Sequence, residues 1–153
     1  MTKHIPLTLQ FNQVRNVTES ICRPLDIEDY SIQVDWFVSP AKWHLAHTTW
    51  FFESFILEKY YKDYRPFDEQ FSYLFNSYYF SKGERHTQSE RGALSRPLMN
   101  KIYEYREYVN RHVAELLDGP TETINRLLVL GLNHEQQHQE LLLQDIKYNF
   151  GSS

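Results

Sequence analysis

Apolar residues recur at intervals of three and four along most of the chain, which is the spacing of one face of an α-helix. Four such stretches are bounded by proline or glycine, and they cover about residues 8–23, 39–61, 95–118 and 121–150. In the first of them, Phe11, Val14, Val17 and Ile21 share one face. The second opens on Ser39-Pro40, which predicts Ser39 as the N-cap and proline at the first helical position. No segment alternates apolar and polar residues in the way that is typical of a half-buried strand. The pattern predicts an all-α fold, a four-helix bundle.

The connections between these helices differ in character. Residues 25–38 are acidic and aromatic, and they predict an ordered connection without a helix. The connection between the second and third helices is longer: residues 67–80 are strongly aromatic and could hold a short helix, whereas residues 81–96 carry glycine, arginine and histidine. Segments of this length are usually functional or disordered, and the aromatic side chains argue against disorder. We expect a long irregular crossover there.

Histidines interrupt the apolar faces of two predicted helices. His134 and His138 are four residues apart, so on a helix they stack one turn apart with Cβ atoms roughly 5–6 Å from each other. On the second helix, His47 shares a face with Trp43 and Trp50. An imidazole buried without partners costs on the order of a few kcal/mol, so these histidines require a ligand, a hydrogen-bond network or an exposed patch. Gly131, one turn before His134, predicts open space beside a bound metal.

The stretch from His134 to His138 also matches the zinc signature H-E-x-x-H, in which Glu135 would be a general base. In such proteases a third ligand follows on the C-terminal side, but the 15 residues after His138 contain no histidine. We therefore expect the third ligand upstream, at His47, with His44 and His112 as alternatives. His44 could instead support a ligand or lie on the surface. Three neutral imidazoles would hold a divalent metal with open positions, without choosing between zinc and iron.

Length, composition and net charge limit the classes of protein to which this chain can belong. With 41% hydrophobic and 16% aromatic residues, the 153-residue chain is long enough for one domain with a real core. A net charge of -4 gives no basic surface for nucleic acid. Cys22 is the single cysteine, which excludes an internal disulfide and suits a reducing compartment. Neither a signal peptide nor a membrane span is predicted. We expect a soluble cytoplasmic protein that forms a single domain over residues 1–153.

Four ordered motifs together resemble a known family. They are Ser39-Pro-Ala-Lys-Trp-His-Leu-Ala-His47, Leu74-Phe-Asn-Ser-Tyr-Tyr79, Gly92-Ala-Leu-Ser-Arg-Pro97 and Gly131-Leu-Asn-His-Glu-Gln-Gln-His138. The chain resembles, over nearly its whole length, the N-terminal DinB-like domain of the ergothioneine-type sulfoxide synthases. The resemblance implies a four-helix bundle whose three histidines bind a non-haem iron(II). With dioxygen, this metal joins a cysteine-containing thiol to trimethylhistidine in ergothioneine biosynthesis.

Carried over by motif position, the resemblance implies His47, His134 and His138 as the metal ligands and favours His47 over His44. It also implies that Gln137 lies near the trimethylhistidine substrate and that Arg85 meets the carboxylate of the sulfur donor. Arg91 and Arg96 are further candidates near the substrate, although a surface charge is the expectation for Arg91. The rings of Tyr73, Phe75, Tyr78 and Tyr79 could form a wall of the pocket or belong to the core.

The chain departs from the family in one respect, because the family proteins continue into a C-terminal formylglycine-enzyme-like domain that this sequence lacks. The resemblance therefore implies an oxidoreductase domain that is incomplete alone and needs a second domain or polypeptide. Two alternatives stay open: a free-standing DinB-like transferase that uses a thiol with zinc or nickel, and a non-catalytic helical interaction module. Iron(II) is the expected cofactor, with zinc or nickel as alternatives. The expected partners are the two small molecules and dioxygen, with no nucleic acid and no membrane.

Overall fold

A computed structural model describes residues 5–77 and 86–151, and all regular structure among them is helical. In chain order the elements are α1 (Leu7–Cys22), η1 (Ile27–Ser31), α2 (Ala41–Phe52), η2 (Glu53–Leu57), α3 (Glu58–Tyr60), α4 (Phe71–Phe75), η4 (Gln88–Ala93), α5 (Met99–Leu116) and α6 (Glu122–Phe150). Of these, η1 and η4 are 3₁₀-helices and η2 is a π-helical turn. The predicted all-α class is confirmed, since these residues contain no strand.

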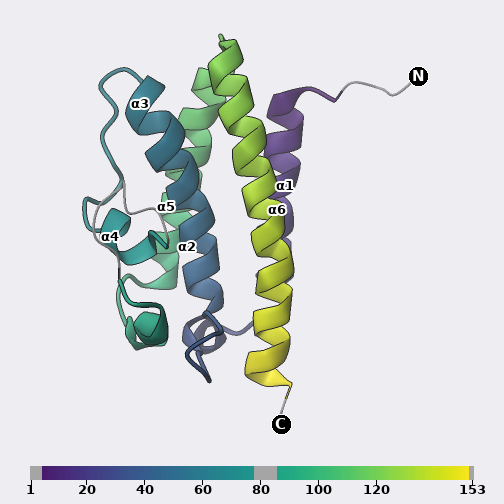
Figure 1. The fold of residues 1–153 in the computed structure, drawn as a ribbon, viewed down its shortest axis with the longest axis vertical. Helices are drawn as coiled ribbons and strands as arrows, with labels where there is room; N and C mark the ends of the chain where they lie inside the picture. The colour runs from purple at the N-terminus through teal and green to yellow at the C-terminus, as the bar shows by residue number, and fades with distance from the viewer. Residues whose placement is uncertain (1–4, 78–85, 152–153) are drawn as a thin grey trace.

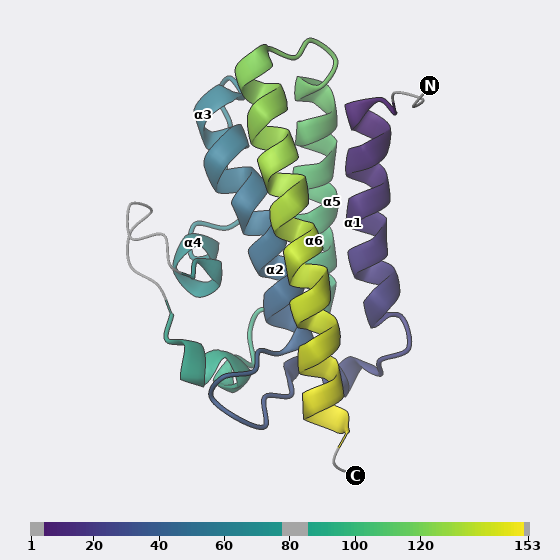
Figure 2. The same cartoon turned by 45° about the vertical axis from the view of Figure 1, so that its right-hand side comes forward.

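Helix α2 occupies the centre of the molecule, where it contacts α1, α5 and α6 (Figure 1). All twelve of its residues are buried because neighbouring elements cover it on every side. Helices α2 and α5 run in one direction along the long axis, whereas α1 and α6 run in the other (Figure 2). The connection from α3 to α5 must therefore return along the whole molecule, and it places α4 against α2. This is the long crossover that the sequence predicted.

The predicted helix boundaries hold at most ends. Helix α1 differs from its prediction by one residue at each end, and α6 begins where Thr121 accepts a hydrogen bond from the backbone N–H of Ile124. Helix α5 begins at Met99, a few residues after the predicted start. Two expectations are wrong. Residues 25–38 do contain the short helix η1, and Pro40 rather than Ser39 occupies the N-cap of α2.

Ser39 does not cap α2 because its polar groups are used in tertiary contacts. Its backbone N–H donates to Asp145 of α6 at 3.0 Å, and its hydroxyl accepts from Arg91 of η4 at 2.9 Å. These two bonds join the start of α2 to the end of α6 and to the crossover. The Ser39-Pro40 pair therefore marks the start of a helix as predicted, but the Ser39 hydroxyl bonds to Arg91 and does not cap α2.

The π-helical turn η2 follows α2 without a break and was not predicted. Its first residue, Glu53, is buried and accepts hydrogen bonds from the hydroxyl groups of Tyr64 and Tyr105 and from the backbone N–H of Phe67. Two of these donors belong to the start of the crossover and one to α5. The carboxylate thus fixes the path of the crossover where it leaves α3, and so helps to place α4 beside the histidine of α2.

The buried faces of α1 and α6 differ from the predicted apolar stripes. On α1 the buried residues are Phe11, Arg15, Thr18 and Cys22, whereas Val17 is exposed. On α6 the buried face passes through Leu128, Glu135 and Leu142, and His134 and His138 lie at its edge. The predicted faces are displaced because polar side chains on both helices are buried as partners of one another.

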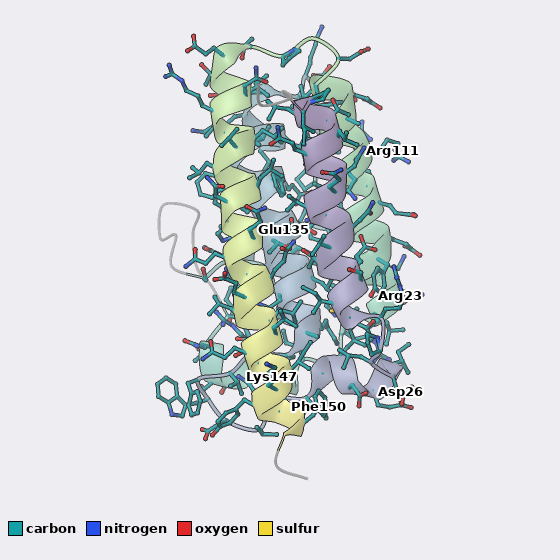
Figure 3. The ribbon with its side chains drawn as sticks, turned by 90° about the vertical axis from the view of Figure 1, so that its right-hand side faces the viewer. Arg23, Asp26, Arg111, Glu135, Lys147 and Phe150 are labelled. Carbon is teal, nitrogen blue, oxygen red and sulfur yellow. The ribbon has the colours of Figure 1, made fainter. Side chains whose placement is uncertain are left out.

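These polar partners form a buried ionic cluster at the centre of the fold. Figure 3 shows Glu135 where α6 faces α1. Its carboxylate accepts from Arg15 Nη1 at 2.7 Å, from Thr18 Oγ1 at 2.6 Å and from Arg106 Nη2 of α5 at 3.2 Å. The cluster is satisfied as a unit, which is the condition for a buried charge to be tolerated. It fixes the rotation of α6 about its own axis and hence the direction of the histidines beside Glu135.

Within the described residues, no helix combines the length and the apolar character that crossing a bilayer requires.

Candidate metal centre

Three histidines from two antiparallel helices converge on one point. His47 lies on α2, and His134 and His138 lie one turn apart on α6. One ring nitrogen of each lies within 4.8 Å of the others, and among the described residues this is the one group of at least three metal-ligating side chains. The ring centroids are 4.6 Å to 5.0 Å apart. Three imidazoles at this spacing can hold one divalent metal ion.

His47 is positioned by its neighbours to offer one nitrogen to the centre of this group. Its Nδ1 lies 2.6 Å from the carbonyl oxygen of Phe75, which can only accept, so Nδ1 carries the proton and Nε2 has a lone pair. The ring lies between Trp43, with centroids 4.3 Å apart, and Trp50, at 5.6 Å. Nε2 is buried and has no hydrogen-bond partner. Buried polar atoms rarely stay unsatisfied, and a metal ion would satisfy this one.

The pair on α6 completes the arrangement. His134 stacks on Phe51 with ring centroids 4.3 Å apart, and its Nδ1 is a second buried nitrogen without a partner. Two unsatisfied imidazole nitrogens in one group of three are an observation independent of the sequence motifs. The donor set therefore fits a transition metal, for which imidazole is a common ligand.

The environment keeps the three imidazoles neutral, as metal binding requires. Burial lowers the pKa of His134 to about 4 and, together with the charges of His44 and His134, that of His138 to about 2. Burial is the main cause that lowers the pKa of His47 well below its ordinary value, and the repulsion that a protonated His47 would meet from protonated His138 and His134 lowers it further. At neutral pH each ring thus keeps a lone pair that a cation can accept.

The two alternative ligands lie elsewhere. His44 is one turn before His47 on α2, but it lies outside the group and bonds to His138 and to Asp145. His112 of α5 packs against Tyr61, Tyr64 and Tyr108, and its Nδ1 lies 2.7 Å from the carbonyl oxygen of Tyr108. The structure therefore brings together the ligand set that the sequence motifs favoured.

A cavity of about 380 Å³ opens onto this group. His134 and His138 contribute to its wall, whereas His47 is completely buried behind them. Gln137 also lines the cavity. A second, smaller recess of about 270 Å³ is walled by Phe51, Phe55, Leu130, Asn133, His134 and Gln137.

Arg91 is not the surface charge that the sequence suggested. It is 6% exposed, lines the cavity, and holds its guanidinium 3.5 Å from the centroid of the Trp43 ring. Arg96, the other candidate, bonds to the carbonyl oxygen of Ser95 and is exposed. Arg85 lies outside the described residues, as do Tyr78 and Tyr79 of the proposed aromatic wall. The two described residues of that proposed wall differ in burial, since Phe75 belongs to the core and Tyr73 is 46% exposed.

Glu135 cannot act as a general base at these histidines. Both of its oxygens are occupied in the buried ionic cluster, on the far side of α6 from the cavity. The spacing explains this, because consecutive residues on a helix differ by about 100°, so the residue after His134 faces another direction. The H-E-x-x-H match therefore combines two histidines that could bind a metal with a glutamate that belongs to the buried ionic cluster.

Gly131 does not leave open space beside the metal, contrary to the prediction. A Cβ atom there would lie 2.4 Å from Cε1 of Phe52 on α2. The ring of Phe52 fills the space, and the missing side chain allows α2 and α6 to approach closely. The glycine therefore sets the separation of the two helices that carry the histidines.

Two residues of the site had weaker sequence signals. Asp145 follows His138 by seven residues, so it lies two turns further along the same face of α6. Trp43 stands four residues before His47 on α2 and stacks on it, a contact that helical spacing alone suggests. In comparisons with known protein families and with curated proteins, no match to this chain was found.

Proposed function

We propose that this chain is the metal-binding domain of a non-haem iron(II) sulfoxide synthase of the ergothioneine type, with a DinB-like four-helix bundle fold. The observation that carries the proposal is the convergence of three neutral imidazoles beside an open cavity, two of them with buried nitrogens that lack any partner. These three histidines are the ones that the sequence motifs select. The four motifs support the proposed family, and the geometry supports a metal site, because the three histidines lie close enough to hold one metal ion.

The donor set suits a metal that must also bind substrates. Three imidazoles add no negative charge, so a divalent ion would keep its full charge and up to three further positions for other ligands. Iron(II) in such a site supplies dioxygen activation. The role of the chain is to hold the ion, to exclude water from its inner side through His47, Trp43 and Trp50, and to orient substrates in the cavity.

The proposed substrates are trimethylhistidine and a cysteine-containing thiol, which the reaction joins through a carbon–sulfur bond. Gln137 is proposed to donate an amide N–H to the trimethylhistidine carboxylate, and its position in the wall of the cavity together with His134 and His138 supports this role. Arg85 is proposed for the carboxylate of the sulfur donor. Since the cavity is open, we propose that a second domain or polypeptide covers it and completes the substrate contacts. The cytoplasm, with its reducing conditions, is the proposed location.

The first experiment measures iron(II) binding by anaerobically prepared protein. We expect one iron per chain in the wild type and at least a 100-fold loss of affinity in His47→Ala. His112→Ala is the matched control, because it removes a half-buried histidine of α5 that is packed among tyrosines away from the centre. Protein that binds neither iron(II) nor another divalent metal would contradict the proposal and favour a helical interaction module.

The second experiment tests the reaction. Iron-loaded protein is supplied with trimethylhistidine, a cysteine-containing thiol and dioxygen, with and without a complementing second domain, and the sulfoxide product is measured by mass spectrometry. Product that depends on iron and on His47 would support the proposal. Transfer of a low-molecular-weight thiol with zinc or nickel, without dioxygen and without a second domain, would instead identify the chain as a metal-dependent thiol transferase.

A further inference from the structure

A line of hydrogen bonds runs from the start of α2 through the end of α6 to one metal ligand. The Oδ2 atom of Asp145 lies 3.0 Å from the backbone nitrogen of Ser39 and 2.7 Å from Nε2 of His44. On the other side of the same ring, Nδ1 of His44 lies 3.1 Å from Nδ1 of His138. Neither Asp145 nor His44 belongs to the group that can hold the metal.

The positions of the protons follow from the chemistry of these groups. A carboxylate only accepts hydrogen bonds, so Nε2 of His44 must carry a proton. A neutral imidazole has one N–H, which leaves Nδ1 of His44 as an acceptor. Two nitrogens 3.1 Å apart then share one proton, and Nδ1 of His138 must donate it. The lone pair of His138 is thereby confined to Nε2.

We propose that Asp145 and His44 are positioning residues, which select the tautomer of His138 whose Nε2 can bind the metal. This inference rests on the metal centre of the proposed function but on no particular metal. Histidine ligands commonly donate their second N–H to a carboxylate or carbonyl, which fixes the ring. Here His47 does so directly to the carbonyl oxygen of Phe75, whereas His138 does so through a second imidazole that a carboxylate holds in place.

The fold places the pair where this role is possible. Asp145 lies two turns after His138 on α6, and His44 lies one turn before His47 on α2, so each helix carries ligands together with a residue that orients them. The second bond of Asp145, from the backbone of Ser39 just before α2, adds an anion at a helix N-terminus, where it is stabilised. Both side chains are held on two sides, so the orientation of the His138 ring is set before any metal arrives.

The direct test reads the tautomers by two-bond ¹H–¹⁵N correlation NMR of metal-free protein at pH 7.5. We expect the proton of His44 on Nε2 and that of His138 on Nδ1. Asp145→Ala removes the acceptor of the His44 N–H, so the His44 proton is no longer confined to Nε2, and both rings are expected to populate both tautomers. Glu140→Gln is the matched control, since it neutralises an exposed carboxylate of the same helix and leaves both tautomers unchanged.

The second test measures Co²⁺ affinity as a probe of the site. We expect Asp145→Ala and His44→Phe each to weaken Co²⁺ binding about 10–100-fold while one ion per chain is still bound at saturation, and Glu140→Gln to stay within twofold of wild type. Circular dichroism confirms that each variant is folded.

Three results would overturn the proposal. They are a wild-type His138 whose proton lies on Nε2, a Co²⁺ affinity of folded Asp145→Ala equal to that of Glu140→Gln, and a complete loss of stoichiometric binding in His44→Phe, which would make His44 a ligand. The NMR measurement needs no variant and no metal. If the wild type binds no metal at all, the proposed function fails while the tautomer result still stands on its own.

Discussion

Glu135 offers the sharpest test of the fold, because among the described residues it is the one carboxylate that forms ion pairs with both Arg15 and Arg106. Glu135→Gln keeps the size of the side chain but leaves Arg15 and Arg106 without a negative partner. The new amide NH₂ group also faces side chains that donate hydrogen bonds, so it cannot accept from them as the carboxylate oxygen does. The Glu135 side chain is 0% exposed and that of Arg15 is 1% exposed, so solvent cannot compensate. Removing one partner of a buried ion pair costs about 3–5 kcal/mol. A typical free energy of unfolding is about 5–15 kcal/mol, so we expect the Glu135→Gln variant to fold but to be much less stable than the wild type.

Urea unfolding at pH 7 measures this loss, with Glu140→Gln on the exposed side of the same helix as the control. For a chain of this size a loss of 3–5 kcal/mol corresponds to a fall in Tm of about 6–20 °C. The control is expected within about 0.5 kcal/mol of wild type. A loss below about 1 kcal/mol at pH 7 would refute the role assigned to the ionic cluster.

The pH dependence provides an independent check. Burial by itself raises the pKa of Glu135, but the charges of Arg15 and Arg106 and the hydrogen bonds from Thr18 and Arg15 outweigh it, so the pKa is lowered overall. A lowered pKa means that the carboxylate stabilises the fold fully above its unfolded pKa of about 4.3, and that this contribution is lost as the pH falls through the folded value. The stability difference between wild type and Glu135→Gln is therefore expected to be flat from pH 8 to about 5 and to shrink below about pH 4. A difference that grows on acidification would contradict the reasoning.

Two further predictions concern the packing of α2 and α1. Gly131→Ala is expected to lose about 1–2 kcal/mol in urea unfolding, despite about 1 kcal/mol of better helix propensity, because the new Cβ would lie 2.4 Å from Phe52. Gly119→Ala, whose Cβ meets nothing within 4 Å, should change stability by less than about 0.5 kcal/mol, and equal losses in the two variants would count against the close approach. Burial raises the pKa of the Cys22 thiol to about 12, so an aromatic disulfide reagent at pH 7.5 should label native protein at least 100-fold more slowly than urea-unfolded protein. Rapid labelling of the native chain would show that α1 does not cover this thiol.

Helix existence follows from the sequence because helical periodicity is a local property. Apolar spacing placed α1 and α6 to within a residue or two, and the spacing of His134 and His138 fixed their stacking on α6 before any tertiary contact was known. The same 100° step also implies that Glu135 faces away from them. A local pattern cannot report η2, since one inserted residue changes the rotation of the helix without changing its composition.

Which face of each helix is buried, and which distant residue completes the metal group, was decided by tertiary structure alone. The apolar pattern predicted the wrong buried face for α1, because Arg15 and Thr18 are buried against Glu135. Glu135 lies 120 positions after Arg15 in the sequence. The sequence preferred His47 as the third ligand but left His44 and His112 as alternatives, until the packing of α2 against α6 brought His47 to the pair on α6. Gly131 was misread for the same reason, because the ring that fills its space comes from the other helix. Contacts between distant segments depend on the packing of the whole chain, and no local pattern contains them.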